Sequence, residues 1–498
     1  MQGEVSMENF LEGLTGDIVL PFEPVYKEAK QGYNSSIQQY PLVIVYCRNN
    51  WDVTNGVLWA QRHEVAIRIR NGGHNYEGYS SGDCTLIIDI SSMNNMSLDM
   101  DTNILTVQAG VTNRQVYEHV TPYGYVFPGG TCPTVGVSGY FLGGGWGLSC
   151  RYLGLGCDSV EEIELINYMG CIIRANKTLN PDLFWALRGG GGGNYGIVTQ
   201  MKFRLNLKAE MVTLIEIDYL HAKEKEQSEF FQVWQKWHNN ADCRMTLISR
   251  IYNSITDGLA MLVRGIFYGS PEEAKAELNG FLELNGAEYN IECLTFIEAV
   301  TIIGSSYPPF EKFQSVSGFA VTYLNNREMA DLIEIIQSRP EGSVFAGLSL
   351  YALGGRVSDI PIEDTAFYYR TAKYIMNLQS TWEEDYYAKE NREWINSNYP
   401  RLMCAASGSY INFPYEKLPD YLCEYYGKHV MRLRVTKEKY DPYNIFTFPQ
   451  GIDSAKTPEI AINRPVEEKG GEEKSIMPVS GEILRGFRYV LSEKKEQD

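Results

Sequence analysis

Short apolar runs separated by polar and glycine-rich stretches organise the N-terminal part of the chain. Apolar runs of strand length occupy residues 65–67, 85–89 and 105–109. Helical spacing of apolar positions covers residues 51–62, and a second helix is expected at 111–120 with Thr112 or Asn113 as its N-cap. Short strands interleaved with helices predict an α+β domain.

From about residue 208 the pattern changes to alternating apolar and polar positions, with fewer glycines. Residues 213–218 and 245–250 alternate as strands with one buried face do. Helices are expected at 224–237, 271–284 and 326–337. This pattern predicts an antiparallel sheet backed by helices, with an open face that could form the substrate side. The aromatic segments 367–370 and 408–413 fit half-buried strands.

A paired glycine directly follows the strand expected at residues 65–67 and the two arginines after it, in the sequence Arg70-Asn71-Gly72-Gly73-His74. Two adjacent glycines allow the backbone to approach a bulky anion, because no Cβ blocks the way. Successive N–H groups in such a turn form a concave anion site. On this stretch alone, a Gly-Gly turn that binds nothing is an equally good interpretation.

Two further glycine-rich stretches follow. Residues 128–147 contain eight glycines, far above the usual share of about 7%. They favour a backbone that lies against a flat or extended ligand, with a glycine-rich packing corner as the alternative. Residues 189–193 are all glycine and stand between a helix capped by Asn180 and a strand at 197–199. This order is the reverse of a phosphate-binding loop, and no Rossmann fingerprint is present.

Composition narrows the class of protein. A chain of 498 residues exceeds what one core usually fills, so two or more domains are expected. A net charge of −18 argues against nucleic-acid binding. The six histidines show no metal-ligand spacing, so no metal is expected. The ten cysteines form no C-x-x-C pair, and no signal peptide or membrane span is visible, so a cytoplasmic protein is expected.

Taken together, these stretches resemble the berberine bridge enzyme-like and glucooligosaccharide oxidase group of FAD-linked oxidases, within the vanillyl-alcohol oxidase superfamily. The resemblance covers roughly residues 17–452 and rests on the segments 70–78, 128–147, 182–198, 408–413 and 440–450. It implies an α+β fold in which two subdomains hold an extended FAD. The expected parts are a FAD-binding domain at 17–208, a substrate domain at 209–413, a segment at 414–452 that returns to the FAD domain, and a polar tail at 453–498 that is expected to be disordered.

The same resemblance implies how the cofactor is held. His74 stands where the family bonds an imidazole to the flavin 8α-methyl, and Cys132 stands where it bonds a thiolate to flavin C6. Both side chains are good nucleophiles, so bicovalent FAD is expected. Val135 matches a position thought to control access of O2 to the flavin. The other implied FAD contacts are Arg70, Asn71, Gly72, Gly73, Asn75, Thr134, Gly139, Gly192, Asn194, Gly196, Val198, Asn412 and Gln450.

The resemblance leaves the catalytic base open. Tyr410 matches a segment beside the flavin ring, where a tyrosine can help remove the substrate proton. The position at which relatives carry a carboxylate or glutamine aligns with Asn377, which cannot act as a base. Tyr140 stands where some relatives have histidine. His429 replaces a usual asparagine; a surface histidine is expected, with a functional replacement near the flavin as the alternative.

The implied activity is that of an oxidase. Hydride passes from an alcohol, a sugar or a secondary metabolite to flavin N5, and O2 then reoxidises the flavin to give H2O2. The expected partners are therefore a small-molecule substrate and O2. Two alternatives remain: a dehydrogenase with another electron acceptor, and a non-catalytic flavin-binding protein with a decayed active site. The second alternative is favoured only by Asn377.

Overall fold

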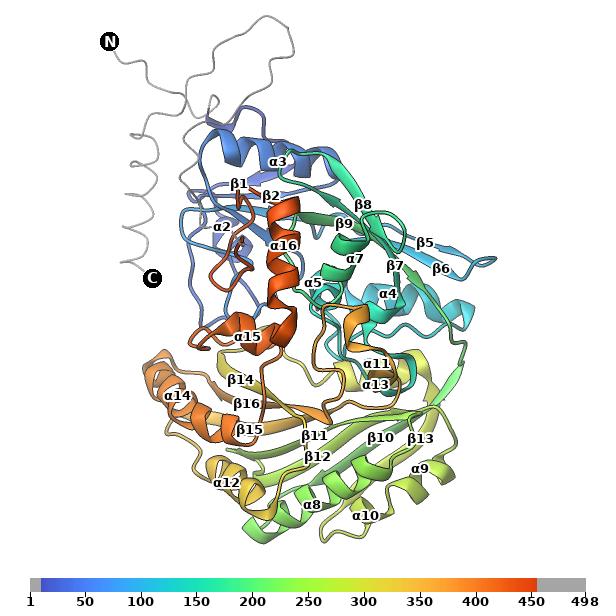
Figure 1. The fold of residues 1–498 in the computed structure, drawn as a ribbon. Helices are drawn as coiled ribbons and strands as arrows, with labels where there is room; N and C mark the ends of the chain where they lie inside the picture. The colour runs from blue at the N-terminus through green and yellow to red at the C-terminus, as the bar shows by residue number, and fades with distance from the viewer. Residues whose placement is uncertain (1–9, 455–498) are drawn as a thin grey trace, which may run out of the picture.

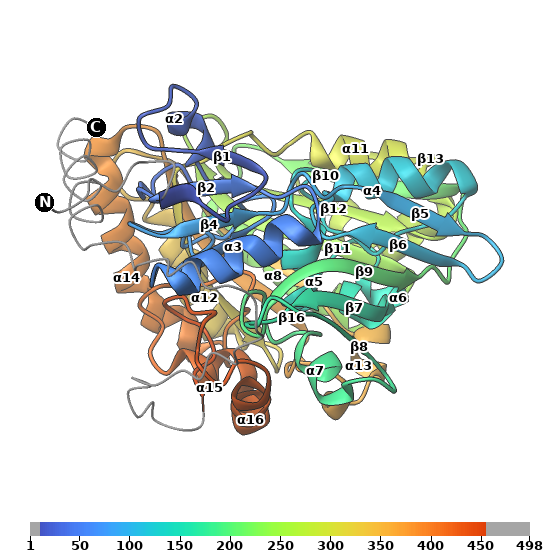
Figure 2. The ribbon, with the colours of Figure 1, turned by 90° about the horizontal axis from the view of Figure 1, so that it is seen from above.

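The computed structural model describes residues 10–454. Two smaller sheets and their helices lie over one face of a large sheet (Figures 1 and 2). One buried apolar cluster extends from Phe10 to Ile452 through both parts of the molecule. The α+β class expected from the sequence is confirmed. The expected tail lies outside the described residues, apart from residues 453 and 454.

A four-stranded sheet ends at the first glycine-rich turn. Its order is β1-β2-β4-β3, with bounds β1 (Asp17–Val19), β2 (Val43–Tyr46), β3 (Ile67–Arg70) and β4 (Leu86–Asp89). Both β2 and β3 run parallel to β4, whereas β1 is antiparallel to β2. Because β3 ends at Arg70, the turn begins at the edge of this sheet.

A five-stranded antiparallel sheet carries the other glycine-rich stretches. Its order is β5-β6-β9-β7-β8, with bounds β5 (Met96–Asp99), β6 (Ile104–Gln108), β7 (Val160–Ile166), β8 (Ile172–Asn176) and β9 (Ile197–Arg204). The helices of this half are α2 (Tyr26–Ala29), α3 (Asn50–Arg62), α4 (Asn113–Val120), α5 (Val137–Leu142), α6 (Cys150–Leu153) and α7 (Pro181–Ala186).

The capping predicted for two of these helices had different outcomes. Helix α4 is confirmed, with Thr112 as N-cap and Gln115 closing a capping box. The side-chain cap expected of Asn180 on α7 is wrong. Asn180 adopts φ 47°, and its Nδ2 donates to the carbonyl of Arg174 rather than facing the helix.

The large sheet is antiparallel and has the order β13-β10-β12-β11-β15-β16-β14. Its strands are β10 (Met211–Tyr219), β11 (Met245–Ser254), β12 (Gly258–Phe267), β13 (Glu288–Thr295), β14 (Phe313–Ala320), β15 (Ser343–Ala352) and β16 (Tyr374–Trp382). Its outer face is covered by α8 (Glu224–Asn240), α9 (Pro271–Glu277), α10 (Asn279–Leu282), α12 (Asn326–Gln337) and α14 (Ala388–Cys404) (Figure 1). The single helix expected at 271–284 is therefore two, because the chain leaves helical geometry at Leu278.

The remaining helices lie between the two parts or close the chain. They are α11 (Phe296–Gly304), α13 (Arg356–Asp359), α15 (Tyr421–Tyr426) and α16 (Val430–Tyr440). Short 3-10 turns are η1 (Thr121–Tyr123), η2 (Gly156–Ser159), η3 (Ile362–Asp364), η4 (Asp385–Tyr387) and η5 (Gly427–His429). Segments 367–370 and 408–413 are irregular, so the strand interpretation of both is wrong.

Helix α16 returns the chain to the N-terminal half. Lys437 Nζ donates to the carbonyls of Asn194 and Phe446 and to the carboxylate of Asp441. Lys437 and Asp441 are fully buried. This pair therefore fastens the end of the described chain to the loop that follows the five glycines.

Candidate active site

A cavity of about 570 Å³ lies between the glycine-rich turns and the large sheet. Residues 67–80, 130–142 and 191–198 form one side, and strands β11, β12, β15 and β16 contribute the other. Of the residues expected from the sequence, the following line it: Asn71, Gly72, Gly73, His74, Asn75, Cys132, Val135, Gly139, Gly192, Gly196, Val198, Asn412 and Gln450. Three glycine-rich stretches that are far apart in the sequence thus meet at one cavity.

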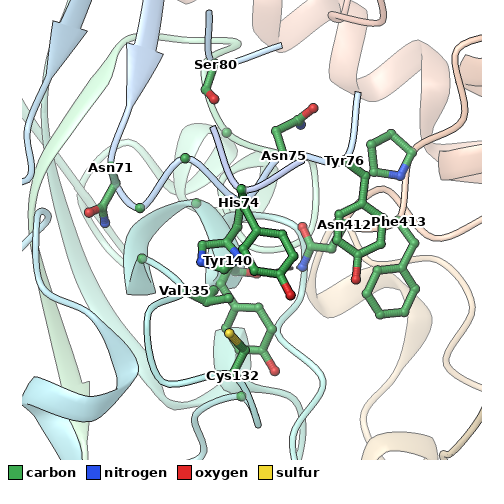
Figure 3. Close-up of a pocket in the computed structure, with 18 of the residues that line it drawn as sticks. Asn71, His74, Asn75, Tyr76, Ser80, Cys132, Val135, Tyr140, Asn412 and Phe413 are labelled. Carbon is green, nitrogen blue, oxygen red and sulfur yellow. Dashed lines mark hydrogen bonds between the residues drawn. The ribbon is translucent and has the colours of Figure 1, made fainter. Parts of the chain in front are cut away.

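His74 and Cys132 meet at a single hydroxyl group. Thr134 Oγ1 lies 2.9 Å from His74 Nε2 and 3.5 Å from Cys132 Sγ. Figure 3 shows both side chains reaching the same part of the cavity, with Val135 between them. Thr134 does not line the cavity itself. Its hydroxyl instead fixes the two candidate nucleophiles relative to each other.

The imidazole of His74 is held as a neutral ring. Tyr33 stacks on it with ring centroids 4.2 Å apart. Burial lowers the pKa of His74 to about 4, so the ring carries no charge at neutral pH. With Nε2 in contact with Thr134, Nδ1 is the nitrogen without a hydrogen-bond partner among residues 10–454. A neutral imidazole with one free nitrogen has the form that a nucleophile needs.

The glycines shape one wall of the cavity for a flat ligand. Among the described residues, a Cβ placed on Gly139 would meet no atom within 4 Å, and one on Gly192 would meet only Leu142 Cδ1 at 3.5 Å and Gly139 Cα at 3.9 Å. The cavity therefore reaches the backbone itself at these two positions. Nearby, Asn71 Oδ1 is buried without a partner among the described residues, while its Nδ2 donates to the carbonyl of Ala109. This wall fits an extended aromatic cofactor with hydrogen-bond donors.

Two residues expected to contact FAD support the wall from behind. Arg70 is buried and forms an ion pair with Asp89, and it also donates to the Tyr46 hydroxyl. Asn194 Nδ2 donates to the carbonyl of Gly190, and its Oδ1 accepts from the backbone of Ile452. Neither side chain lines the cavity. Both hold glycine-rich segments in place instead.

Tyr410 does not line the cavity either. Its hydroxyl oxygen accepts hydrogen bonds from the backbone N–H groups of Gly145 and Trp146 and from Asn412 Nδ2. The side chain is 1% exposed, and burial raises its pKa. A catalytic role for Tyr410 stays a prediction, and this geometry does not favour it.

Asn377 lies on β16 outside the cavity lining, and its Oδ1 is buried without a partner among the described residues. The wall positions of β16 are Gln379 and Thr381. Gln379 is two residues along the strand from Asn377, on the same face. The polar positions of β16 that meet the cavity are therefore Gln379 and Thr381, and no sequence motif singles out either one.

Sequence reasoning also missed a group of polar residues on the large-sheet side of the cavity. Arg250 of β11, Glu311 and Tyr307 line the cavity together with Gln379. Glu311 is the one carboxyl side chain among the described residues of the wall. Its loop carries no recognisable motif, and only the pairing of Asn34 with Glu311 brings it to the cavity. No local sequence signal could have identified it.

The structure also gives the positions of His429 and Tyr140. His429 is buried, with Nδ1 3.2 Å from the carbonyl of Ala366 and the ring against Trp185, so the surface location is wrong. It is not among the residues that line the cavity. Tyr140 does line the cavity, and its hydroxyl is buried without a partner among the described residues.

Comparison with known proteins agrees with this geometry. Residues 41–176 match the FAD binding domain family, and residues 409–453 match the family described as berberine and berberine like. An uncharacterised FAD-linked oxidoreductase of Bacillus subtilis, YgaK, is 33% identical and aligns over 88% of this chain and 97% of its own. The chain belongs to the berberine bridge enzyme-like family of FAD-linked oxidoreductases.

Other family members are similar over most of their length. Berberine bridge enzyme-like D-1 of Nicotiana tabacum is 27% identical over 83% of this chain and 82% of its own. The structure of Physcomitrella patens BBE-like 1 covers 90% of this chain and 99% of its own, with a TM-score of 0.83 and 26% identity. Among the described residues of this FAD-linked oxidoreductase, no helix has the length and apolar character to cross a membrane.

Proposed function

We propose that this oxidoreductase carries FAD bonded to both His74 and Cys132 and works as an oxidase. It takes hydride from an alcohol, a sugar or a secondary metabolite and passes the electrons to O2, which gives H2O2. The observation that carries the proposal is the contact of His74 and Cys132 with the one hydroxyl of Thr134. Two nucleophiles fixed this way beside a cavity can attach to two positions of one ring.

The cofactor, when bound, supplies the two-electron acceptor for substrate oxidation. The chain supplies the binding surface: the bare backbone at Gly139 and Gly192 makes room for a flat ring, and Asn71 offers an oxygen that has no partner in the part of the chain that the structure describes. Val135 lines the same cavity, and its small side chain leaves room for O2. Two covalent bonds would hold the ring without enclosing it, so the substrate side can stay open to large molecules.

The substrate side is rich in aromatic rings. Tyr76 and Phe413 stack with centroids 5.3 Å apart, and Phe413 packs 5.2 Å from Tyr351. All three line the cavity. Aromatic faces can pack against sugar rings as well as against other aromatic rings. Solved relatives of this fold include a xylooligosaccharide oxidase with xylobiose and berberine bridge enzyme, so both substrate classes belong in the test.

The test is a peroxidase-coupled H2O2 assay over sugars, alcohols, amines and aromatic secondary metabolites. Flavin absorbance under anaerobic conditions is followed in parallel. We expect at least one compound both to bleach the flavin and to yield H2O2 in air. Bleaching without H2O2 would replace the oxidase by a dehydrogenase. Neither signal with any compound would favour a non-catalytic flavin-binding protein.

A further inference from the structure

Removal of hydride from an alcohol leaves a hydroxyl proton that a base must accept. Apart from Cys132, which the proposed function commits to the flavin, two groups of the cavity wall have the chemistry of a base near neutral pH, His74 and Glu311. The proposed function commits His74 to the flavin. Tyr410 and Asn377, the candidates from the sequence, do not line the cavity. Glu311 is thus the remaining base among the described wall residues.

The backbone places Glu311 beside the segment that holds His74. Its N–H donates to the carbonyl of Tyr33 over 3.1 Å, and its own carbonyl accepts from Ser35 N–H over 2.9 Å. Tyr33 in turn stacks on His74, and its N–H donates to the carbonyl of Gly73. The position of Glu311 is therefore tied to the proposed flavin attachment segment rather than to the large sheet alone.

Two phenols of the cavity wall also lie near both Glu311 and Cys132. The phenol of Tyr33 and the phenol of Tyr307 each interact electrostatically with both Glu311 and Cys132. Tyr307 also hydrogen-bonds to Thr131, the neighbour of Cys132. In the isoalloxazine ring, C6 is bonded to the carbon that carries N5. A group on the Cys132 side is thus on the side of the reactive nitrogen if Cys132 bonds C6.

The surroundings of Glu311 suit a proton acceptor. Gln379 Nε2 donates to Glu311 Oε2 over 3.0 Å, which orients the carboxyl group. Burial raises the pKa of Glu311, and the guanidinium of Arg250 opposes that rise. The neighbouring Lys312 is turned away and pairs with Asp385. A carboxyl with a raised pKa is a stronger base once it is ionised.

We propose that Glu311 is the catalytic base, and that Gln379 positions it. This inference rests on the proposed function. The O–H bond of the substrate breaks and its proton goes to Glu311 Oε, while the C–H bond breaks and its electron pair leaves as hydride to the bound FAD. The new bond is the C=O of the product. Glu311 then returns the proton to solvent before the next turnover.

The first test uses Glu311→Gln, which keeps the shape and the oxygen that accepts from Gln379. With a compound that reduces wild-type flavin, we expect the anaerobic rate of reduction to fall by about 100-fold or more. The wild-type rate should fall at low pH as Glu311 becomes protonated, and the variant should lose this dependence. Glu311→Asp should recover part of the rate. Glu77→Gln is the matched control, because Glu77 is a buried carboxyl with a raised pKa outside the cavity wall.

The second test needs no substrate and uses sulfite, an anion that adds to flavin. Loss of the negative charge of Glu311 should tighten sulfite binding by about tenfold at about pH 8, while Glu77→Gln changes nothing. If the wild type turns over a substrate, and Glu311→Gln has the same rate of flavin reduction and the same sulfite affinity as the wild type, then Glu311 is not the base. The proposed function would still stand in that case. A wild-type flavin that no compound reduces would instead count against the proposed function, and sulfite would still report whether Glu311 acts at the flavin.

Discussion

At the scale of single residues, the tyrosine that the sequence put forward has a structural task. Three donors point at the Tyr410 oxygen, and two of them are backbone N–H groups of the glycine-rich turn at Gly145 and Trp146. A buried donor without an acceptor costs more than the net gain of one hydrogen bond. Tyr410 therefore fixes the turn that carries one wall of the cavity.

We predict that Tyr410→Phe lowers the free energy of unfolding by about 2 kcal/mol, because buried donors lose their acceptor. The rate of flavin reduction should fall by less than about tenfold, since the hydroxyl does not reach the cavity. Denaturant unfolding and anaerobic reduction of the same preparation measure the two effects. A normal stability with a rate loss of about 100-fold or more would restore Tyr410 as a catalytic residue.

The stability of the folded protein should depend on pH through the carboxyl group of Glu77. Its Oε1 accepts from Gln314 Nε2 and from the backbone of Glu416, so it joins the N-terminal half to β14 and the C-terminal segment. Burial raises the pKa of Glu77 from 4.5 to about 7. The folded state thus binds this proton more tightly than the unfolded state does. The resulting stabilisation is complete below about pH 4.5 and is lost as the pH rises through about 7.

Glu77→Gln cannot titrate. The Tm of the variant minus that of the wild type should therefore increase between about pH 5 and about pH 8, by an amount equivalent to on the order of 3 kcal/mol. Thermal unfolding of both holoproteins across this range measures the difference. A constant difference would mean that the pKa of Glu77 is ordinary.

At the scale of elements, a substitution in α5 can test cofactor binding without disturbing the fold. Gly139 lies inside this helix, and a Cβ there meets no protein atom. Alanine is the better helix former, so Gly139→Ala should leave the fold intact or stabilise it by up to about 1 kcal/mol. The methyl group would nevertheless occupy space that the flavin needs.

We therefore predict that Gly139→Ala folds normally and carries much less flavin than the wild type. The ratio of flavin to protein absorbance, with circular dichroism as the check on folding, gives the answer. A full complement of flavin in the variant would show that the cofactor does not lie against α5.

In α16, by contrast, we predict that a substitution destabilises the fold, because the buried lysine Lys437 is needed for it. Lys437→Met leaves the carboxylate of Asp441 buried without its partner, and we expect a loss of about 3–5 kcal/mol in the free energy of unfolding. Lys439→Met is the matched control on the same helix. Its pair with Asp182 is exposed, so the loss should be no more than about 1 kcal/mol. Equal losses of unfolding free energy in the two variants would show that the buried pair of Lys437 and Asp441 does not stabilise the fold more than an exposed pair does.

The elements that could be predicted from the sequence are those with strong local signals. The helix predicted at residues 326–337 is α12 at its observed bounds, and the structure shows that Asn325 caps it. The apolar pattern did not predict the irregular buried segments correctly. Residues 408–413 look like a strand, but the bonds of Tyr410 and Asn412 to residues 140–146 hold them as a loop. Such contacts are set by tertiary packing, which periodicity does not report.

At the scale of the whole molecule, the glycine-rich wall of the cavity was predictable from the sequence and the wall on the large sheet was not. The glycines with His74 and Cys132 are local motifs with a chemical reason, and the structure brings them to one cavity. Arg250, Glu311 and Gln379 come from three segments of the large-sheet half. They belong to no motif, because each is a single polar residue among sequence neighbours that give no sign of a site. Only the packing of the two halves across the cavity makes them neighbours.

The central claim is that one FAD is bonded to both His74 and Cys132, and denaturation tests it most directly. The purified protein is precipitated with acid and washed, and flavin absorbance is measured in the pellet and in the supernatant for the wild type, His74→Ala, Cys132→Ala and the double variant. We predict that all flavin stays with the wild-type pellet, that each single variant keeps one bond and its flavin, and that the double variant releases whatever it holds. Release of FAD from the denatured wild type would contradict the claim.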